Sequence, residues 1–483
     1  MKRYMDRKQI WWDLCFALLC ALGAFAIDFA IVFKKIFGEV SVEQILFHLQ
    51  FPIMQSDPAI IYKFAKRVGV ALIVFVLALI YTRIFSKKYR FIIPVILISI
   101  GGILMQKNMH VYELLTYKNT KSYGEFYENH YINPDSTHIT APTKKRNLVL
   151  ILLESMESTF GGFIGGGLQG EGVEGDFIPR LSHLAQNHLH FSNTHTLGGI
   201  TQLNGTGWTI AGIVSYMCGF PLYMPIRDNE FMNDSFLSSA TCLGDILDDF
   251  GYENSFIMGS NERFAGRGGF LKTHKIKNYD YDYYKANGKI PKDYDINWGF
   301  EDAKLFAFAK EKLQQYAGSD KPFAMMLLTT DTHAPDGYVD KNICDFEDNY
   351  QNAILCSDRE VGDFVSWIQT QSFSDDTTIV ILGDHLSMKQ DFFAKDLKRS
   401  VFDVFINSAS KTKHSKSRQI SHFDMFPTIL AALGFEIEGD RLGLGVNLFS
   451  DETTLLERLG REAFNDGLDE DSRIYEGFWK QKL

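Results

Sequence analysis

The 483-residue sequence predicts transmembrane helices followed by an α/β domain with a central, mostly parallel β-sheet. Three apolar stretches near the N-terminus predict the transmembrane helices. Short aliphatic runs that alternate with helical patterns predict the α/β domain. We therefore expect a membrane anchor over residues 1–106, a connector over 107–145, the α/β domain over 146–450 and a peripheral C-terminal segment over 451–483.

The apolar stretches cover residues 10–33, 68–85 and 91–105. The first is long enough to cross a bilayer, and the third is the shortest of the three. No small-residue cleavage site follows the first stretch, so the pattern indicates an anchor rather than a removable signal peptide. Asp28 lies near the outer end of that stretch, which favours a position at the membrane interface over a functional role inside the bilayer.

Basic residues flanking these stretches indicate an orientation. Two groups of four, one before the first stretch and one between the second and third, are expected in the cytoplasm: Lys2, Arg3, Arg7 and Lys8, then Arg83, Lys87, Lys88 and Arg90. The loop between the first two stretches carries five further basic residues, so the asymmetry is moderate. Three spans with the N-terminus inside place everything after about residue 106 outside the cytoplasm.

The net charge changes sign near residue 110, close to the end of the expected membrane anchor. Residues 1–110 carry a net charge of +8 and residues 111–483 carry −18, which together give the −10 of the whole chain. This division is typical of a basic membrane-side segment followed by an acidic domain. No basic stripe is visible in the large domain, so the sequence argues against nucleic-acid binding.

Four cysteines of the large domain occur as two near pairs, Cys218 with Cys242 and Cys344 with Cys356. An even number of cysteines outside the cytoplasm predicts disulfide bonds, and four buried thiols are the alternative. No Cys-x-x-Cys spacing is present, which argues against a cysteine zinc site.

The expected strands are short aliphatic runs of the kind that lie buried in parallel sheets. They cover residues 147–153, 255–258, 323–328, 377–382 and 401–406, with helical patterns at 243–250 and 302–316. Loops at the carboxyl ends of such strands are where ligands bind in α/β sheets. We therefore expect the chemistry of the domain at that edge.

Two of these strands are followed by ionisable residues. Glu154 comes directly after the first run, and Asp384 and His385 come directly after the fourth. Because the carboxyl ends of parallel strands meet at one edge, these side chains are expected to converge. Two carboxylates, an imidazole and a hydroxyl oxygen would suit Mn²⁺, Mg²⁺ or Zn²⁺.

The hydroxyl is expected from the run Gly-Thr-Gly-Trp-Thr-Ile-Ala-Gly at 205–212. Thr209 is the favoured nucleophile, because the glycines around it let the backbone approach a phosphate and a helix start there would present N–H groups to anionic oxygens. A coordinated divalent ion would lower the pKa of its hydroxyl and offset phosphate charge. A helix N-cap is the structural alternative for Thr209, and Thr201 and Thr206 remain competing nucleophiles.

These motifs, with others in the same order, resemble a known family. The further stretches are Leu-Glu-Ser at 153–155, Cys-Gly-Phe-Pro-Leu at 218–222, Cys-Leu-Gly-Asp-Ile-Leu at 242–247, Arg-Phe-Ala-Gly-Arg at 263–267, Phe-Leu-Lys at 270–272, Trp-Gly-Phe at 298–300, Asp-Thr-His at 331–333, Pro-Asp-Gly at 335–337 and Asp-His-Leu at 384–386. Over about residues 145–450 the chain resembles the phosphoglycerol transferases that modify periplasmic glucans, within the alkaline phosphatase and sulfatase-like superfamily. It is more distantly similar to lipoteichoic acid synthases.

The resemblance implies a sulfatase-like catalytic domain over 146–450 and a set of metal ligands in it. Glu154, Thr209, Asp384 and His385 match the ligands of one divalent ion, with Thr209 also the nucleophile. The family implies Mn²⁺, while Zn²⁺ occupies equivalent sites in related phosphoethanolamine transferases and Mg²⁺ is a further alternative.

The resemblance also implies substrate-binding residues. Arg267 and His333 match positions that hold the phosphoglycerol group, and His333 is a candidate proton carrier. Asp331 and Asn204 are further candidates for binding substrate. The cysteines at 218, 242, 344 and 356 match cysteines of the glucan-modifying relatives.

The implied activity is transfer of sn-glycerol phosphate from phosphatidylglycerol to an extracytoplasmic glycan through a phosphoglyceryl-threonine intermediate. The enzyme would sit in a bacterial inner membrane with its catalytic domain on the periplasmic side. Periplasmic glucan, lipopolysaccharide and capsule are all open as acceptors, because the relatives carry a long C-terminal region with no counterpart here. Lipoteichoic acid synthases place a tryptophan near the matched arginine, where this chain has Ala265, which argues against a Gram-positive role.

Other function classes are also considered. A phosphoethanolamine transferase acting on lipid A or another envelope glycan would use the same metal and threonine. A sulfatase is disfavoured because no Cys/Ser-x-Pro-x-Arg pattern surrounds Thr209, and a non-catalytic scaffold because every ligand type is present.

Three further features favour structural roles. His195 is expected to be a surface or core histidine. The pattern around His422 and Asp424 indicates a turn into a late helix, although His422 could line the cleft. The glycine cluster at 161–167 reads as a surface loop, because no Lys-Ser/Thr follows at the spacing of a nucleotide loop.

Overall fold

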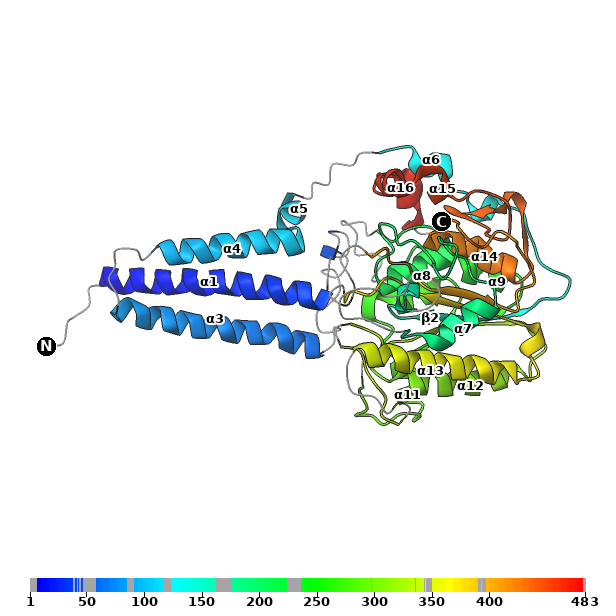
Figure 1. Ribbon diagram of the computed structural model, residues 1–483, viewed down its shortest axis with the longest axis horizontal. Coiled ribbons are helices and arrows are strands. Elements are labelled where there is room, and N and C mark those ends of the chain that lie inside the picture. The colour runs from blue at the N-terminus through cyan, green and yellow to red at the C-terminus, as the bar shows by residue number, and fades with distance from the viewer. Residues whose placement is uncertain are drawn as a thin grey trace. The chain divides into compact units, whose positions relative to one another are not determined.

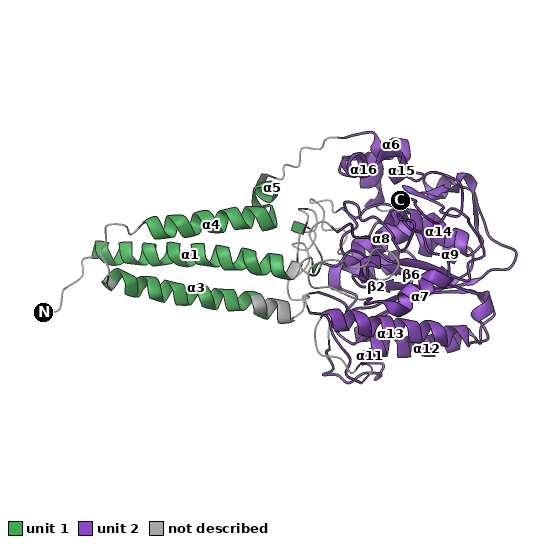
Figure 2. Ribbon diagram, viewed as in Figure 1, with its two compact units in different colours: residues 1–119, 388–390 green, residues 120–387, 391–483 purple. Residues whose placement is uncertain are grey.

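The structure is a computed structural model, and it divides into two compact units, residues 1–119 with 388–390 and residues 120–387 with 391–483 (Figure 2). It describes residues 7–37, 58–84, 91–116, 123–161, 176–223, 236–296, 298–334, 336–342, 350–389 and 397–480, together with residues 40, 42, 45, 46, 344 and 392. Most of the glycine cluster at 161–167 lies outside the described residues.

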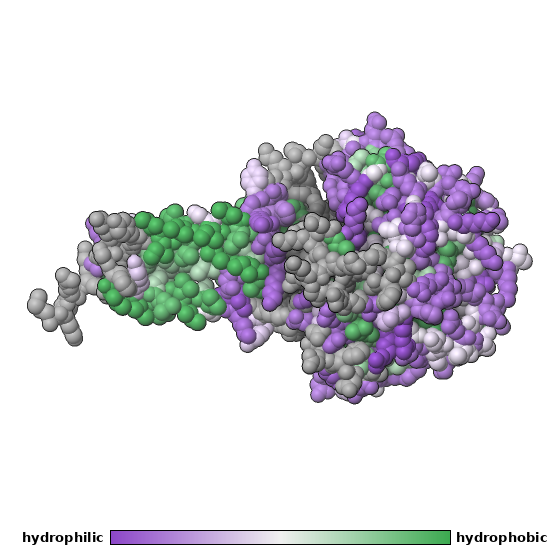
Figure 3. Space-filling model, viewed as in Figure 1, coloured by the Kyte–Doolittle hydropathy of each residue, from purple (hydrophilic) through white to green (hydrophobic). Residues whose placement is uncertain are grey.

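The first unit contains three helices long and apolar enough to cross a membrane. They are α1 (Arg7–Phe37), α3 (Pro58–Ile84) and α4 (Ile92–Met109), followed by the short α5 (Val111–Thr116). Each candidate span overlaps one of the predicted apolar stretches. Apolar side chains cover the outer surface of these helices, as expected for a surface that faces lipid (Figure 3).

Helix α1 packs against both α3 and α4 (Figure 1). Gly23 of α1 and Gly101 of α4 allow the two backbones to approach closely, because a Cβ atom on Gly101 would lie 2.7 Å from the Cβ of Ala26. Arg67 of α3 donates from Nη1 to both carboxylate oxygens of Asp28 at 3.2 Å, so this carboxylate is balanced within the helical unit. The ion pair gives Asp28 a structural role.

The second unit is built around a six-stranded sheet with the strand order β4-β3-β5-β2-β6-β7. Neighbouring strands are parallel except for β7, which pairs antiparallel with β6. The strands are β2 (Asn147–Leu153), β3 (Glu253–Met258), β4 (Lys277–Tyr279), β5 (Phe323–Leu328), β6 (Thr377–Gly383) and β7 (Asp403–Ile406). The predicted α/β class with a mostly parallel sheet is confirmed.

Helices cover both faces of this sheet (Figure 1). One side carries α7 (Pro179–Asn187), α12 (Asp302–Tyr316) and α13 (Tyr350–Gln369), and the other carries α8 (Thr209–Cys218), α9 (Leu243–Asp249) and α14 (Met425–Ala432). Because both faces are covered, the central strands β2, β5 and β6 are almost entirely buried, which explains their continuous aliphatic sequences.

Shorter elements complete the unit. They are α6 (Phe126–His130), α10 (Arg267–Thr273), α11 (Tyr281–Ala286) and the two-residue strands β1 (Ile139–Thr140), β8 (Glu436–Ile437), β9 (Arg441–Leu442) and β10 (Gly445–Val446). The C-terminal segment forms α15 (Leu455–Leu459), α16 (Arg461–Leu468) and α17 (Arg473–Phe478). Phe478 stacks on Phe220 with ring centroids 4.5 Å apart, so this segment packs onto the domain.

Candidate active site

The ends of two adjacent central strands define the candidate site. β2 and β6 are parallel and in register, with Leu153 opposite Gly383, so the residues that follow them lie at one edge of the sheet. Ligand atoms of Glu154, Asp384 and His385 lie within 4.8 Å of one another, and all three residues are buried. The structure therefore brings together the three ionisable residues expected there.

Thr209 joins this cluster from the first turn of α8. Its Oγ1 donates a hydrogen bond to Glu154 Oε2 at 3.2 Å. The capping position belongs to Trp208, so Thr209 is not the N-cap of the helix. Thr206 instead bonds with its hydroxyl to the backbone of Leu203, and the backbone of Thr201 pairs with that of Ile420. Of the three threonines, the structure places only Thr209 against Glu154.

A close backbone contact allows α8 to reach the site. A Cβ atom on Gly212, one turn into the helix, would collide with the backbone carbonyl oxygen of Asp384. Only glycine lets the two backbones approach this closely without a shift. Gly212 therefore explains one of the small residues around Thr209.

Ser155 orders the two carboxylates from a strained position. Its φ of 53° is unusual for a non-glycine residue. Its backbone N–H donates to Asp384 Oδ1 at 2.7 Å, and its Oγ donates to Glu154 Oε1 at 2.7 Å. Strain of this kind persists at functional sites because the surrounding contacts hold it.

The donor set fits a divalent cation. Asp384 Oδ1 accepts backbone N–H bonds from Ser155 and His385, whereas its Oδ2 is buried and accepts no hydrogen bond in the described part of the chain. His385 Nε2 lies 3.5 Å from both Glu154 Oε1 and Asp384 Oδ2. An imidazole nitrogen and carboxylate oxygens at this spacing match the ligands that Zn²⁺ and Mn²⁺ take.

The electrostatics of the carboxylates support the same conclusion. Burial, followed by the charge of Glu154, raises the pKa of Asp384 well above its ordinary value. Burial opposes ionisation of Glu154 too, but the nearby His333 and His385 and the Ser155 and Thr209 hydrogen bonds lower its pKa. Two buried carboxylates this close need a cation for both to be charged.

Arg267 and His333 bring cationic or proton-carrying groups toward this edge. The guanidinium of Arg267, at the start of α10, donates from Nε to Phe264 O at 3.1 Å and from Nη2 to Asn261 O at 3.2 Å. Burial lowers its pKa to about 10 despite the opposing pull of Glu154, so Arg267 stays charged at neutral pH. His333 bonds through Nδ1 to the carbonyl oxygen of Ala334 at 2.6 Å, and no hydrogen bond to its Nε2 is found among the described residues.

Trp298 connects these two groups. Its ring centroid lies 4.6 Å from that of His333 and 5.4 Å from that of Phe264, over whose ring the Arg267 guanidinium sits. Trp298 belongs to the Trp-Gly-Phe motif, from which no role for this residue was predicted. The Trp-Gly-Phe signal at 298–300 could have suggested a wall for the site, but not its contacts.

Two of the expected substrate-binding residues have other partners. Asn204 donates through its side-chain amide to Asp469 at 2.8 Å, beside α16. Asp331 accepts a hydrogen bond from the backbone N–H of Asp302 at 3.0 Å, in a separate buried carboxylate cluster. Asp469 and Asp302, the partners of these two side chains, lie outside the Glu154, Asp384 and His385 cluster, and substrate binding by Asn204 and Asp331 stays a prediction.

His422 and Tyr216 contact the backbone that carries Asp384, and no role for Tyr216 was predicted from the sequence. Their rings stack with centroids 4.8 Å apart, and Tyr216 donates to Gly383 O at 2.5 Å. Burial lowers the pKa of His422 to about 3, so the ring is neutral and its Nε2 donates to Asp384 O at 3.1 Å. His195, by contrast, bonds to the exposed Ser417.

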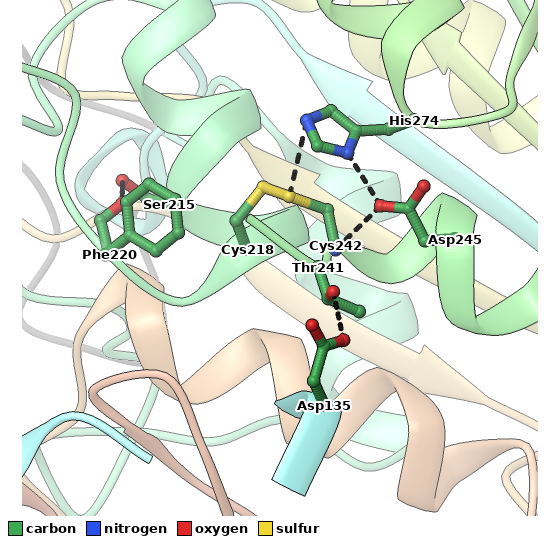
Figure 4. The surroundings of a disulfide bond; sticks show 8 residues. All are labelled: Asp135, Ser215, Cys218, Phe220, Thr241, Cys242, Asp245 and His274. Carbon is green, nitrogen blue, oxygen red and sulfur yellow. Dashed lines mark hydrogen bonds and ion pairs between the residues drawn. A yellow bond between two sulfur atoms is a disulfide. The ribbon is translucent and has the colours of Figure 1, made fainter. Parts of the chain in front are cut away.

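Both cysteine pairs form disulfide bonds, Cys218–Cys242 and Cys344–Cys356. The first joins the last residue of α8 to the residue before α9, so it ties down the helix that begins with Thr209. Figure 4 shows His274 beside this bond, with its Nδ1 2.6 Å from Asp245 Oδ2.

The sequence is similar to a known protein family and to curated proteins. The sequence matches the family described as Sulfatase over residues 146–435. It is 33% identical over 327 residues to Phosphoglycerol transferase I of Escherichia coli O127:H6 (strain E2348/69 / EPEC), which covers 65% of this chain and 40% of that protein. The chain thus spans less than half the length of this curated relative.

A solved membrane-protein structure shares the fold. The integral membrane protein lipooligosaccharide phosphoethanolamine transferase A (EptA) from Neisseria meningitidis aligns with a TM-score of 0.50 and 14% identity, over 88% of this chain and 84% of that one. The lipoteichoic acid synthase LtaP from Listeria monocytogenes aligns with a TM-score of 0.49 and 17% identity, over 65% and 79% of the two chains.

Proposed function

The chain belongs to the sulfatase family, and on that premise we propose that it is a membrane-anchored phosphoglycerol transferase. The observation that carries the proposal is the Thr209 hydroxyl hydrogen-bonded to Glu154 within the Glu154, Asp384 and His385 cluster. The 33% identity to proteins named phosphoglycerol transferase I supports the choice of transferred group.

Glu154, Asp384, His385 and Thr209 would hold one divalent cation, with Mn²⁺ the ion we propose and Zn²⁺ or Mg²⁺ the alternatives. When bound, the cation would lower the pKa of the threonine hydroxyl and offset the charge of the phosphate. The buried Oδ2 of Asp384, which accepts no hydrogen bond from the described residues, supports a bound cation.

In the first half-reaction, Thr209 Oγ1 attacks the phosphorus of phosphatidylglycerol. The hydroxyl proton passes to Glu154 Oε2, which already accepts its hydrogen bond. The phosphorus–oxygen bond to diacylglycerol breaks, and His333 Nε2 protonates that leaving oxygen. The product on the protein is a phosphoglyceryl ester of Thr209.

In the second half-reaction, an acceptor hydroxyl attacks the same phosphorus and its proton returns to His333. The ester bond to Thr209 breaks, and Glu154 returns the proton to Oγ1. Arg267 stabilises the phosphate oxygens in both halves with its charged, planar guanidinium. Its low exposure favours this role, because a buried charge interacts more strongly with another charge.

The three apolar helices support the proposed donor and location. Three apolar helices would keep the catalytic domain close to a donor that never leaves the bilayer. We place the protein in a bacterial inner membrane with the catalytic domain on the periplasmic side. We also propose that the chain divides into an anchor (1–106), a connector (107–145), the catalytic domain (146–450) and a peripheral C-terminal segment (451–483). The acceptor is an envelope glycan hydroxyl, from periplasmic glucan, lipopolysaccharide or capsule.

The test uses full-length protein in liposomes that contain either phosphatidylglycerol or phosphatidylethanolamine, each labelled in its head group. The proposal expects diacylglycerol release and label transfer to added glycan only with phosphatidylglycerol. Transfer from phosphatidylethanolamine alone would instead support the phosphoethanolamine transferase. Release from neither lipid would contradict both functions.

A further inference from the structure

A second buried group of carboxylates lies outside the proposed catalytic cluster. Asp302 is the first residue of α12, Asp331 follows β5, and Glu360 lies in the middle of α13. One carboxylate oxygen from each lies within 4.8 Å of the others. The three residues are 1%, 3% and 6% exposed, so the carboxylate triad is shielded from water.

The backbone holds two members of the triad in place. Asp302 accepts the backbone N–H of Thr330 at 2.8 Å through Oδ1 and that of Asp331 at 3.1 Å through Oδ2. Asp331 in turn accepts the N–H of Asp302 at 3.0 Å. This reciprocal arrangement fixes both carboxylates before any ligand binds.

Glu360 lacks such support. Its Oε1 is buried and has no hydrogen-bond partner in the part of the chain that the structure describes. Among the same residues, neither Asp302 nor Glu360 pairs with a lysine or arginine, and the nearby Lys304 pairs with Glu301. Burying a carboxylate oxygen without a partner is energetically unfavourable, so this oxygen indicates a missing ligand or proton.

Electrostatics point the same way. Burial, then the charges of Asp302, Asp340 and Glu301, raises the pKa of Glu360 to about 9. Burial also raises the pKa of Asp302 to about 7, against the hydrogen bonds that Thr330 and Asp331 donate. Burial therefore disfavours the ionised forms of Glu360 and Asp302 unless a cation or a proton joins them.

We propose that Asp302, Asp331 and Glu360 bind a second divalent cation, and that this cation is Ca²⁺. The ligand set contains only carboxylate oxygens, which suit hard cations, whereas the catalytic cluster includes an imidazole. Ca²⁺ accepts irregular geometry and oxygens at about 2.3–2.6 Å, so one ion can reach all three carboxylates. Mg²⁺ is disfavoured because it keeps several waters, and the triad is almost fully buried.

The cation would fix the loop that carries His333. Asp331 lies two residues before His333, and its carbonyl accepts the N–H of Tyr338 at 2.7 Å, while His333 O accepts that of Gly337 at 3.1 Å. Binding at Asp331 would therefore stiffen the whole turn. The proposed binding of a cation to the triad does not depend on the proposed function. An effect of that cation on catalysis does depend on the proposed function, because it would act through His333.

The competing explanation is a proton. Glu360 could be a neutral acid that donates a hydrogen bond to another carboxylate, with no metal involved. The two explanations differ for Glu360→Gln, because an amide can replace a neutral acid as a donor but is a poor substitute for a charged ligand. Ca²⁺ binding by the full-length protein therefore separates them.

The experiment uses full-length protein in detergent, first stripped with chelator and then loaded with Mn²⁺, and measures bound Ca²⁺ by equilibrium dialysis. The variants are Glu360→Gln, Asp302→Asn and Glu154→Gln. The matched control is Asp358→Asn, because Asp358 is also buried on α13 but accepts the backbone N–H groups of Arg180 and Leu181. Retained Mn²⁺ shows that each triad variant is folded.

The proposal expects one Ca²⁺ per chain in the wild type, Glu154→Gln and Asp358→Asn, and none in Glu360→Gln or Asp302→Asn. Saturating Ca²⁺ should raise Tm by about 5 °C only where it binds. A wild type that binds no Ca²⁺ overturns the proposal. So does a Glu360→Gln protein that retains Mn²⁺ and still shows the full Ca²⁺ binding and Tm shift.

Discussion

Thr209 Oγ1 lies 3.2 Å from Glu154 Oε2 and donates a hydrogen bond to it. This bond connects the start of α8 to the end of β2, two elements that lie more than fifty residues apart in the sequence. It places the hydroxyl that we propose as the nucleophile beside the two carboxylates and the imidazole that we propose as metal ligands.

Gly212→Ala should reduce transfer at least about tenfold and destabilise the domain by about 1–3 kcal/mol. The added methyl group would collide with the Asp384 carbonyl and push α8, with Thr209, away from the cluster. Initial rates and thermal unfolding of the full-length protein measure both effects. Gly477→Ala is the control, because a Cβ there meets nothing within 4 Å, and equal losses in both variants would contradict the argument.

Arg267→Lys should lower kcat/KM about 100-fold. Lysine keeps the positive charge but lacks the planar guanidinium. In Arg267 that group donates to Phe264 O and Asn261 O, and we propose that its other N–H groups bind phosphate. Arg263→Lys is the matched control, because that side chain is 68% exposed and pairs with Asp282. Similar losses in the two variants would show that Arg267 has no special role.

Replacing Cys218 and Cys242 together with serine should lower stability by about 3 kcal/mol and reduce activity at temperatures where the wild type still works. The disulfide restrains the far end of the helix that begins with Thr209. Thermal unfolding and residual activity after mild heating provide the measurements. Cys15→Ser, at a free cysteine in α1, should match the wild type. A double variant as heat-resistant as the wild type would count against this role.

Asp403→Asn should stabilise the protein progressively as pH rises from about 4 to about 8. Burial raises the pKa of Asp403 to about 8, while an unfolded aspartate titrates near about 4. The folded state therefore binds the extra proton in this window, so wild-type stability falls as pH rises. Asparagine can accept the Phe191 N–H without ionising. The Tm difference between variant and wild type should grow with pH, and a constant difference would refute the assignment.

The sequence predicted most of the sheet and the centre of the site for physical reasons. β2, β5 and β6 are buried on both faces, so their sequences are continuously aliphatic and easy to recognise. Glu154, Asp384 and His385 follow such strands directly, which made their convergence predictable. The three-residue β4 was missed, because Lys277 is exposed and too few residues remain to form a pattern.

The remaining features depend on tertiary contacts that no local pattern encodes. The Tyr216–His422 stack joins residues over two hundred positions apart, and Glu360 meets Asp302 and Asp331 only after three elements pack. The hydrogen bond from Asn204 to Asp469 depends on how the C-terminal segment folds back. Asn204 was expected to bind substrate because it directly precedes the glycine-rich run at 205–212. That position in the sequence does not determine which residue its side chain contacts.

The most direct test of the central claim is to trap the covalent intermediate. Full-length protein is incubated with phosphatidylglycerol labelled in its glycerol head group and no acceptor, then digested and analysed by mass spectrometry. We predict a phosphoglyceryl group on Thr209, its loss when acceptor glycan is added, and no labelled protein in Thr209→Ala. A Thr209→Ala protein that still transfers at the wild-type rate, or a label on another residue, would contradict the mechanism.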